Sequence, residues 1–247
     1  MMKQHILCII PARFGARRLP GKPLQLIEGQ PLIVWVYRNA VASGAFDEVC
    51  VAADDERIIA AVREAGGSAE MTAETHQSGT DRINEVAGRL SCTHIVNIQG
   101  DEPCIDHDNL KAFSTAIRQI DDNSLLTLVG HATIEEKLSP NVVKAVLDRH
   151  NRALYFTRAA VPFERDGTTG PCLKHMGIYG FTAKSLQRFC SFPVGILERT
   201  ERLEQLRALE NGMTIQCIVR DFSSNGIDTM EDLELFRQKA PECHYGT

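Results

Sequence analysis

Residues 6–24 read ILCIIPARFGARRLPGKPL, a short apolar run followed by a cluster of positive charge. The run at 6–10 is too short for a signal-peptide core or a membrane span, so we predict a buried β-strand there. Four cations follow within ten residues: Arg13, Arg17, Arg18 and Lys22. The loop after the first strand of an open α/β sheet is a common place for a bound phosphate. The stretch therefore predicts such a sheet, with an anion at its edge.

The composition is that of an ordinary globular protein. The 247 residues carry a formal net charge of −5, with 43% hydrophobic and 24% charged residues. This balance argues against a disordered chain and against a basic protein that coats nucleic acid. We expect no nucleic-acid partner and no membrane partner, and recognition of an anion must depend on local cations.

Eight cysteines are spread along the chain, and no two lie closer than twelve residues. This spacing excludes the CxxC pairs of zinc knuckles and redox sites. A reducing, cytoplasmic location fits the pattern best.

Apolar runs of four to six residues alternate with segments of helical period, which is typical of βαβ units. The predicted fold class is α/β: a Rossmann-like, mostly parallel sheet flanked by helices, with an antiparallel β-rich insertion. Asp54 or Asp55 is expected to cap the second helix, and Gly66-Gly67 to end it. The expected elements of the first half are helices at 31–43, 56–65 and 80–90 and strands at 49–53 and 94–98.

The sequence becomes β-rich from about residue 124, with a hairpin connection predicted at 148–151. Helices at 197–210 and 230–239 enclose a strand at 214–219. No Pro- or Ser-rich linker marks a domain cut. We therefore predict a single domain over 1–247, divided into parts at 1–123, 124–181 and 182–247.

The basic loop matches neither of the two common phosphate motifs. No GxGxxG follows the first strand, and the Gly15 to Lys22 segment has one residue too many for a Walker A loop, with Pro23 in place of the hydroxyl residue. Gly15 and Gly21 allow close backbone approach, and the cations suit a triphosphate. The alternative is a solvated basic loop.

Seven motifs occur in order along nearly the whole chain. They are IPAR and RLPGKPL in the opening stretch, HQSGTDR at 76–82, NIQGDEP at 97–103, KHMGIYGF at 174–181, LEQLRALE at 203–210 and GIDTMEDL at 226–233. Together they resemble the 3-deoxy-manno-octulosonate cytidylyltransferase family, the CMP-Kdo synthetases. Sialic-acid cytidylyltransferases are similar in the first half only.

The resemblance implies a nucleotide-diphospho-sugar transferase type of fold and a Mg²⁺-dependent transfer of CMP from CTP to the anomeric hydroxyl of 3-deoxy-D-manno-octulosonate (Kdo). Diphosphate is released, and the product serves lipopolysaccharide synthesis. It also implies a homodimer. Residues 1–123 would bind the nucleotide, 124–181 would bind the sugar and dimerise, and 182–247 would close the domain.

The nucleotide side combines the basic loop with the loop before the third helix. Such a transfer needs positioning and charge neutralisation, so Lys22, Arg18 and Asp101 are the expected catalytic residues. Ala16 and Arg17 depart from the hydroxyl residues usual in the family. The expected nucleotide-binding residues are Ala12, Arg13, Arg18, Lys22, Ser78, Gly79 and Arg82.

The metal and sugar residues follow from the resemblance. Asp101 ends a predicted strand, beside Gln99 and Glu102, where a hard cation that bridges phosphates would be held. The resemblance adds Asp228 as the second metal ligand. The expected sugar-binding residues are Gln99, Arg158, His175, Tyr179, Glu204 and Gln205.

Several of these residues have simpler readings. Ser78, Thr80 and Asp228 suit helix caps, and Asp101 a turn. His175 alone suits a structural histidine, although its spacing from Tyr179 places both on one face of a strand. Glu204 and Gln205 are expected on a helix whose buried stripe is formed by Leu203, Leu206 and Leu209. Lys144 is a weaker candidate for the nucleotide side.

Three other functions stay open from sequence. The 8-amino analogue of Kdo is an alternative sugar. A catalytically silent CTP-binding regulator is kept open by Ala16 and Arg17. A nicotinamide dehydrogenase is disfavoured by the missing glycine fingerprint.

Overall fold

The computed structural model describes residues 4–15, 19–76, 78–166, 170–222 and 226–240. The chain forms two compact units, one made of residues up to 115 together with those from 223 onward, and one made of residues 116–222. The boundary falls within helix α4 (His107–Ile117). These bounds differ from those of the three parts expected from sequence, because the expected part at 182–247 is divided: residues 182–222 belong to the second unit and those from 223 onward to the first.

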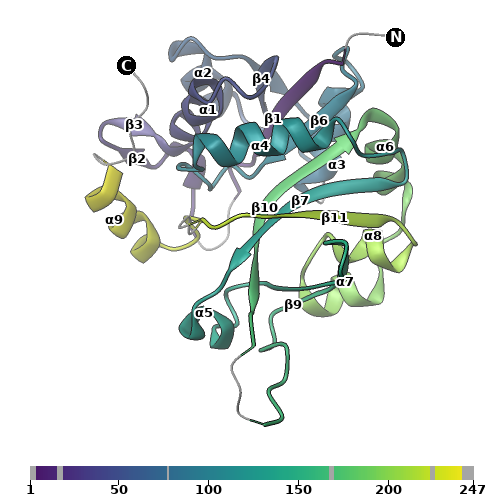
Figure 1. Ribbon diagram of the computed structural model, residues 1–247. Helices are drawn as coiled ribbons and strands as arrows, with labels where there is room; N and C mark the ends of the chain where they lie inside the picture. Colours follow the sequence, from purple (N-terminus) through teal and green to yellow (C-terminus); the bar gives the residue numbers. More distant parts are fainter. Residues whose placement is uncertain (1–3, 16–18, 77, 167–169, 223–225, 241–247) are drawn as a thin grey trace. The chain divides into compact units, whose positions relative to one another are not determined.

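Four parallel strands lie side by side in the first unit in the order β6-β1-β4-β5 (Figure 1). Every residue of β1 is buried, as expected of a parallel strand covered on both faces. Cys8 of β1 pairs with Val49 of β4 and Val96 of β6, so the carboxyl ends of these strands share one edge. The bounds are β1 (Ile6–Ala12), β4 (Glu48–Ala53), β5 (Ala69–Met71) and β6 (His94–Ile98).

The helices predicted at 31–43 and 56–65 are present within one residue of the expected ends, and the helix predicted at 80–90 begins one residue early and ends three residues early. Asp55 is the N-cap of α2, since its side chain accepts a hydrogen bond from the amide of Arg57. Asp54 does not cap the helix. The helical elements of this unit besides α4 are η1 (Lys22–Leu24), α1 (Leu32–Ala42), α2 (Glu56–Glu64), α3 (Gly79–Ala87) and α9 (Met230–Lys239).

Helix α9 packs beside a small antiparallel sheet of β2 (Leu26–Ile27) and β3 (Gln30–Pro31), as Figure 1 shows. Arg237 donates two hydrogen bonds to the carbonyl of Leu26, at 3.0 and 2.8 Å. The rings of Phe236 and Trp35 meet edge to face at 6.0 Å. These contacts fix α9 against Leu26 and Trp35.

The second unit carries the predicted antiparallel addition. Strand β10 pairs antiparallel with β7 and β8, β8 pairs antiparallel with β9, and β11 runs parallel to β7. The turn expected at 148–151 joins β8 to β9, with Asn151 at a φ of 57°. The strand bounds are β7 (Ser124–His131), β8 (Lys144–Leu147), β9 (Ala153–Thr157), β10 (Leu173–Thr182) and β11 (Thr214–Val219). The α/β fold class with a mostly parallel sheet and an antiparallel addition is therefore confirmed.

The single helix predicted at 197–210 is wrong. Arg202 adopts a left-handed conformation (φ 57°, ψ 44°), which a right-handed helix does not accommodate, and the segment divides there. Glu204 and Gln205 lie in the turn between the two helices rather than on a helix. The helices of this unit are α5 (Ile134–Leu138), α6 (Ala183–Ser191), α7 (Ile196–Glu201) and α8 (Leu206–Glu210).

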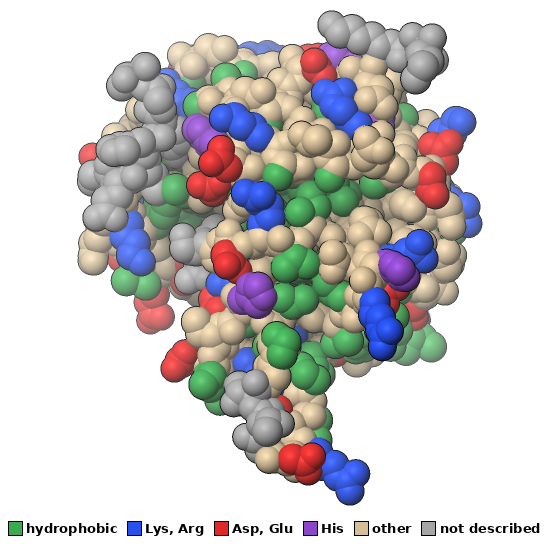
Figure 2. Space-filling view, in the orientation of Figure 1, with side chains coloured by type: hydrophobic (Ala, Val, Ile, Leu, Met, Phe, Trp, Pro, Cys, Tyr) green, Lys and Arg blue, Asp and Glu red, His purple; other side chains and the backbone are tan. Residues whose placement is uncertain are grey.

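The distribution of charged side chains is as expected from the composition, and the state of the cysteines is as expected with one exception. Lys and Arg side chains are interspersed with Asp and Glu on the face shown in Figure 2. No helix among the described residues is both long and apolar enough to cross a bilayer. Six described cysteines are free, whereas Cys104 is disulfide-bonded, which departs from the expectation of reduced thiols throughout.

Lys144 of β8 is completely buried, which the sequence did not indicate. Its Nζ donates to the carbonyls of Ser139, Val142 and Arg158, each at 2.7 Å. Burial lowers the pKa of this ammonium. The side chain therefore holds the backbone around the start of β8 and the end of β9. All three hydrogens of the ammonium are engaged in these contacts, so Lys144 does not suit a nucleotide contact.

Replacement of Lys144 by Met is expected to reduce the free energy of unfolding by about 3 kcal/mol or more, because three carbonyls lose the donor that they share. Urea denaturation measures the change. Lys184→Met is the control: its side chain is 80% exposed, so the expected change is below about 0.5 kcal/mol. Equal effects in the two variants would contradict the structural role.

Candidate active site

A pocket of about 500 Å³ lies at the carboxyl edge of the sheet in the first unit. Its walls are formed by the end of β1, residues 19–23, the start of α3, the end of β6 and the segment before α9. Concave sites of this size are typical of small-molecule binding. The lining residues are Pro11, Ala12, Arg13, Leu19, Lys22, Pro23, His76, Ser78, Gly79, Arg82, Gln99, Gly100, Asp101 and Asp228.

Lys22 lies between the two predicted metal ligands. Its Nζ is 2.6 Å from Asp101 Oδ2 and 3.1 Å from Asp228 Oδ1. The lysine side chain is 13% exposed, against 28% for Asp101 and 44% for Asp228. The two carboxylates, predicted from distant motifs, thus face one cation.

Backbone packing brings these side chains together. The amide of Ile227 donates to the carbonyl of Asp101 at 2.9 Å, which ties the GIDTMEDL segment to the end of β6. A Cβ at Gly100 would lie 2.7 Å from the carbonyl oxygen of Pro11, so only glycine allows β6 and β1 to end this close together. The cap of α9 is Thr229, with a complete capping box, and not Asp228. The Asp228 side chain is therefore not the N-cap considered from sequence, although its amide donates to Asp232 Oδ2 at 3.0 Å.

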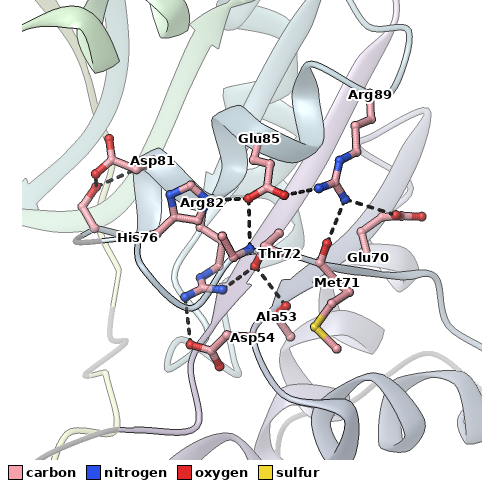
Figure 3. Close-up of polar contacts among 12 residues, drawn as sticks. Ala53, Asp54, Glu70, Met71, Thr72, His76, Asp81, Arg82, Glu85 and Arg89 are labelled. Carbon is pink, nitrogen blue, oxygen red and sulfur yellow. Dashed lines mark hydrogen bonds and ion pairs between the residues drawn. The ribbon is translucent and has the colours of Figure 1, made fainter.

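The opposite wall is the start of α3. Ser78 is its N-cap: Oγ accepts from the amide of Asp81 at 3.1 Å and donates to the Asp81 carboxylate at 2.9 Å. The capping reading of Ser78 is thus confirmed, while its hydroxyl also lines the pocket. Arg82, 3% exposed, reaches from α3 toward Asp54 and Thr72 (Figure 3).

His76 lines the same wall, and the sequence reasoning gave it no role. Its Nε2 is 2.5 Å from Glu85 Oε2, and Glu85 also accepts from the amide of Ala73 and from Arg89 (Figure 3). The hydrogen bond from His76 is the main cause of the lowered pKa of Glu85. The histidine in HQSGTDR was the only sequence signal for this pair.

The predicted sugar residues other than Gln99 belong to the second unit. His175 and Tyr179 do share a face, with ring centroids 5.4 Å apart, although a register shift in β10 interrupts the regular strand between them. His175 Nε2 is 2.8 Å from Thr127 Oγ1, and the Tyr179 hydroxyl donates to Gln205 Oε1 at 3.1 Å. Burial lowers the pKa of His175 to about 3 and strongly raises the pKa of Tyr179.

Arg158 is held by the backbone around it. Its Nε donates to the carbonyl of Glu201 at 3.1 Å and its Nη1 to the carbonyl of Pro140 at 3.1 Å. The Glu201 carboxylate accepts from the Arg158 amide and from Thr157 Oγ1. The guanidinium is thus fixed in orientation without a direct side-chain ion pair among these contacts.

Every predicted nucleotide residue within the described part of the chain lines the pocket, as does Gln99. Ala16, Arg17 and Arg18 lie outside the described residues. Pro11, Leu19, Pro23 and His76 also line the pocket and were not predicted. The binding and catalytic roles assigned from sequence stay predictions.

Asp101 and Asp228 are the side chains of the pocket that could hold a metal ion. No group of three or more His, Cys, Asp or Glu side chains within the described ranges is arranged to hold a metal. Mg²⁺, however, commonly takes one or two carboxylates and completes its shell with water and phosphate oxygens. Asp101 and Asp228, which already face a shared cation, fit that requirement.

The fold is one found among nucleotide-transferring enzymes. A solved cytidylyltransferase from Leptospira borgpetersenii is 17% identical, with a TM-score of 0.67, and the match covers 97% of this chain and 88% of that one. At this identity the likeness concerns the fold. A solved CMP:2-keto-3-deoxy-manno-octonic acid synthetase, complexed with CTP, is 36% identical with a TM-score of 0.92, over 97% of this chain and 99% of that chain.

The family model "Cytidylyltransferase" matches residues 7–215. A 3-deoxy-manno-octulosonate cytidylyltransferase from Syntrophobacter fumaroxidans is 46% identical over 93% of this chain and 94% of its own length. A relative with the same name from Thermodesulfovibrio yellowstonii is 41% identical over 93% and 95%. The chain belongs to the cytidylyltransferase family, in the branch of the 3-deoxy-manno-octulosonate cytidylyltransferases.

The depressed pKa of His175 makes stability depend on pH. Below about pH 6.5 the unfolded chain takes up a proton at this histidine, whereas the folded chain does so only near pH 3. Stability is therefore lost as the pH falls through this window. Between pH 7 and pH 5 the expected loss is roughly 2 kcal/mol.

Urea denaturation of the wild type and His175→Gln at both pH values measures this contribution. The variant should show the smaller loss of stability on acidification. His150→Gln, which changes an exposed histidine, should behave as the wild type. An unchanged loss in His175→Gln would contradict burial of a neutral imidazole.

Proposed function

We propose that this chain transfers CMP from CTP to the anomeric hydroxyl of 3-deoxy-D-manno-octulosonate, releasing diphosphate and forming CMP-Kdo for lipopolysaccharide synthesis. The observation that carries the proposal is the contact of Lys22 with Asp101 and Asp228 inside a pocket that contains the family's motifs. The membership of the chain in the 3-deoxy-manno-octulosonate branch supports the choice of sugar.

In this proposal the pocket of the first unit binds the nucleotide. Lys22 and Arg13 face the triphosphate, with Arg18 from the basic loop as a further cation. Arg82 and the Ser78-Gly79 start of α3 lie on the other side, toward the nucleoside. The transfer of CMP needs alignment of the attacking and leaving oxygens and neutralisation of the phosphate charge. It needs little covalent chemistry from the protein.

Asp101 and Asp228 are the residues that would hold Mg²⁺. When bound, the ion would neutralise phosphate charge and orient the α-phosphate for attack. In the structure the two carboxylates contact Lys22, so this lysine shares its partners with the proposed ion. Its positive charge also suits it to contact phosphate. Its exchange between carboxylates and phosphate would keep the pocket near neutral charge.

For the sugar, the second unit offers a fixed guanidinium and several neutral groups. Arg158 suits the carboxylate of Kdo, because an oriented guanidinium binds a carboxylate through two parallel hydrogen bonds. His175, neutral above about pH 3, and Tyr179 with Gln205 suit hydroxyl groups. Glu204 completes the proposed sugar contacts of this unit.

Purified protein incubated with CTP, Kdo and Mg²⁺ should release diphosphate only when both substrates are present. Enzyme-coupled detection of diphosphate measures this. Binding of CTP without any release would instead support the silent nucleotide-binding regulator.

A second candidate sugar has support among the relatives. An 8-amino-3,8-dideoxy-manno-octulosonate cytidylyltransferase from Shewanella pealeana is 42% identical over 94% of this chain and 96% of its own length. Turnover of the two sugars under the same conditions separates the readings. A higher kcat/KM for the amino sugar would reassign the substrate.

Asp101→Asn is expected to lower turnover by roughly 100-fold or more, since one of the two carboxylates proposed to hold Mg²⁺ is lost. The melting temperature should change little, because the carboxylate is partly solvated. Asp108→Asn, an exposed acid on α4, should match the wild type in both measurements. A large loss of stability in Asp101→Asn would favour a structural role.

Chelation of divalent metal by EDTA is expected to abolish diphosphate release, and excess Mg²⁺ to restore it. Asp228→Asn should require a higher Mg²⁺ concentration for half-maximal activity, because one of two protein ligands is lost. Full activity in EDTA would contradict the proposed metal.

A homodimer and a cytoplasmic location complete the proposal, both as properties implied by the family resemblance. Size-exclusion chromatography with light scattering measures the oligomeric state. A mass near 27 kDa, that of one chain, would contradict the dimer.

A further inference from the structure

Asp54 follows β4 directly, and both of its carboxylate oxygens are engaged. Oδ1 accepts a hydrogen bond from the amide of Phe14 at 3.0 Å, and Oδ2 accepts from Arg82 Nη2 at 2.9 Å. Because Asp55 caps α2, Asp54 is not needed for that helix. The side chain joins two segments that form opposite walls of the nucleotide pocket.

The contact with Arg82 is that of a buried ion pair. The Arg82 side chain is 4% exposed and the Asp54 side chain 14%. Arg82 Nη1 donates to Thr72 Oγ1, which in turn donates to the carbonyl of Ala53 at 3.0 Å (Figure 3). A buried guanidinium needs a charge partner, and these two acceptors fix the plane of its fork.

The contact with Phe14 fixes the base of the basic loop. Phe14 follows Arg13, which lines the pocket. The guanidinium carbon of Arg57 lies 3.6 Å from the centroid of the Phe14 ring. On the loop side, a Cβ at Gly21 would come within 3.4 Å of the same ring. Phe14 is thus held by its amide and by its ring, and Asp54 provides the amide contact.

We propose that Asp54 is a positioning residue for the nucleotide. It sets the basic loop and the Arg82 guanidinium at a fixed distance from each other, and it neutralises the charge of Arg82, which then acts as an oriented donor. The inference rests on the proposed function, because the ligand it serves is CTP. It does not require Asp54 to touch the nucleotide.

Asp54→Asn separates the two contacts. The amide side chain can still accept from Phe14, but the ion pair with Arg82 is lost, and a displaced guanidinium should raise the Kd for CTP roughly ten- to a hundredfold. Isothermal titration calorimetry with CTP alone measures this. In steady-state kinetics the KM for CTP should rise while the KM for Kdo stays within about twofold.

Glu198→Gln is the matched control. The Glu198–Arg207 pair in the second unit is equally buried, with side chains 12% and 5% exposed, and is bidentate at 2.8 and 2.7 Å. Both variants should lower the melting temperature, but only Asp54→Asn should change the Kd for CTP. An equal loss of CTP affinity in both would overturn the proposal, as would an unchanged Kd in folded Asp54→Asn.

Thr72→Val is the second variant in case Asp54→Asn does not fold. It keeps the size of the side chain and removes the other acceptor of Arg82, so a several-fold rise in the Kd for CTP is expected, and an unchanged Kd would count against the proposal. Absence of diphosphate release by the wild type would instead overturn the proposed function. The CTP titrations are independent of that result.

Discussion

The ammonium of Lys22 lies between the carboxylates of Asp101 and Asp228, which are 79 and 206 positions further along the chain. The pocket depends on this contact, because it joins the basic loop, the end of β6 and the segment before α9 around one charge. The surrounding backbone makes the contact possible. The close approach of Gly100 to Pro11 and the hydrogen bond from Ile227 to Asp101 leave little freedom in where the carboxylates lie.

The pocket proposed for the triphosphate pairs its cations with acidic side chains of the protein. Lys22 has two carboxylate partners and Arg82 has one, so the charges of these two cations are balanced within the protein. Arg13, by contrast, is exposed at the entrance. In the proposed function, phosphate oxygens would take the place of these carboxylates as the partners of Lys22.

Much of the first unit was predictable from sequence, since local signals decide it. The apolar run of β1, the cap and glycine stop of α2, and the strand ends that carry Ala12 and Gln99 all follow from patterns within a few residues. The motif order also predicted which distant residues share the pocket. These patterns could not decide which of Asp54 and Asp55 caps α2, because adjacent acids fit an N-cap equally well. Only the tertiary contacts of Asp54 with Phe14 and Arg82 show that it has another role.

The second unit was less predictable for the same reason. The left-handed conformation at Arg202 was not predictable, because it occurs without the glycine or asparagine that usually indicates it. The register shift in β10 depends on the pairing of this strand with β7. Lys144 carries a charge that normally indicates solvent, yet three carbonyls from neighbouring turns make its burial favourable. These features arise from packing between segments, which the composition of either segment does not encode.

The first unit is discontinuous in sequence, since residues 116–222 form a compact unit of their own between its two portions. Domains generally fold as units while the chain leaves the ribosome, amino-terminal portions first. The basic loop, Asp54 and Asp101 are therefore synthesised well before Asp228, and the intervening unit must emerge in full before the second carboxylate arrives. A nascent chain stopped at residue 222 carries nearly the whole pocket and one acid instead of two, so the contact between Lys22 and its second carboxylate is the last of these contacts to form during synthesis.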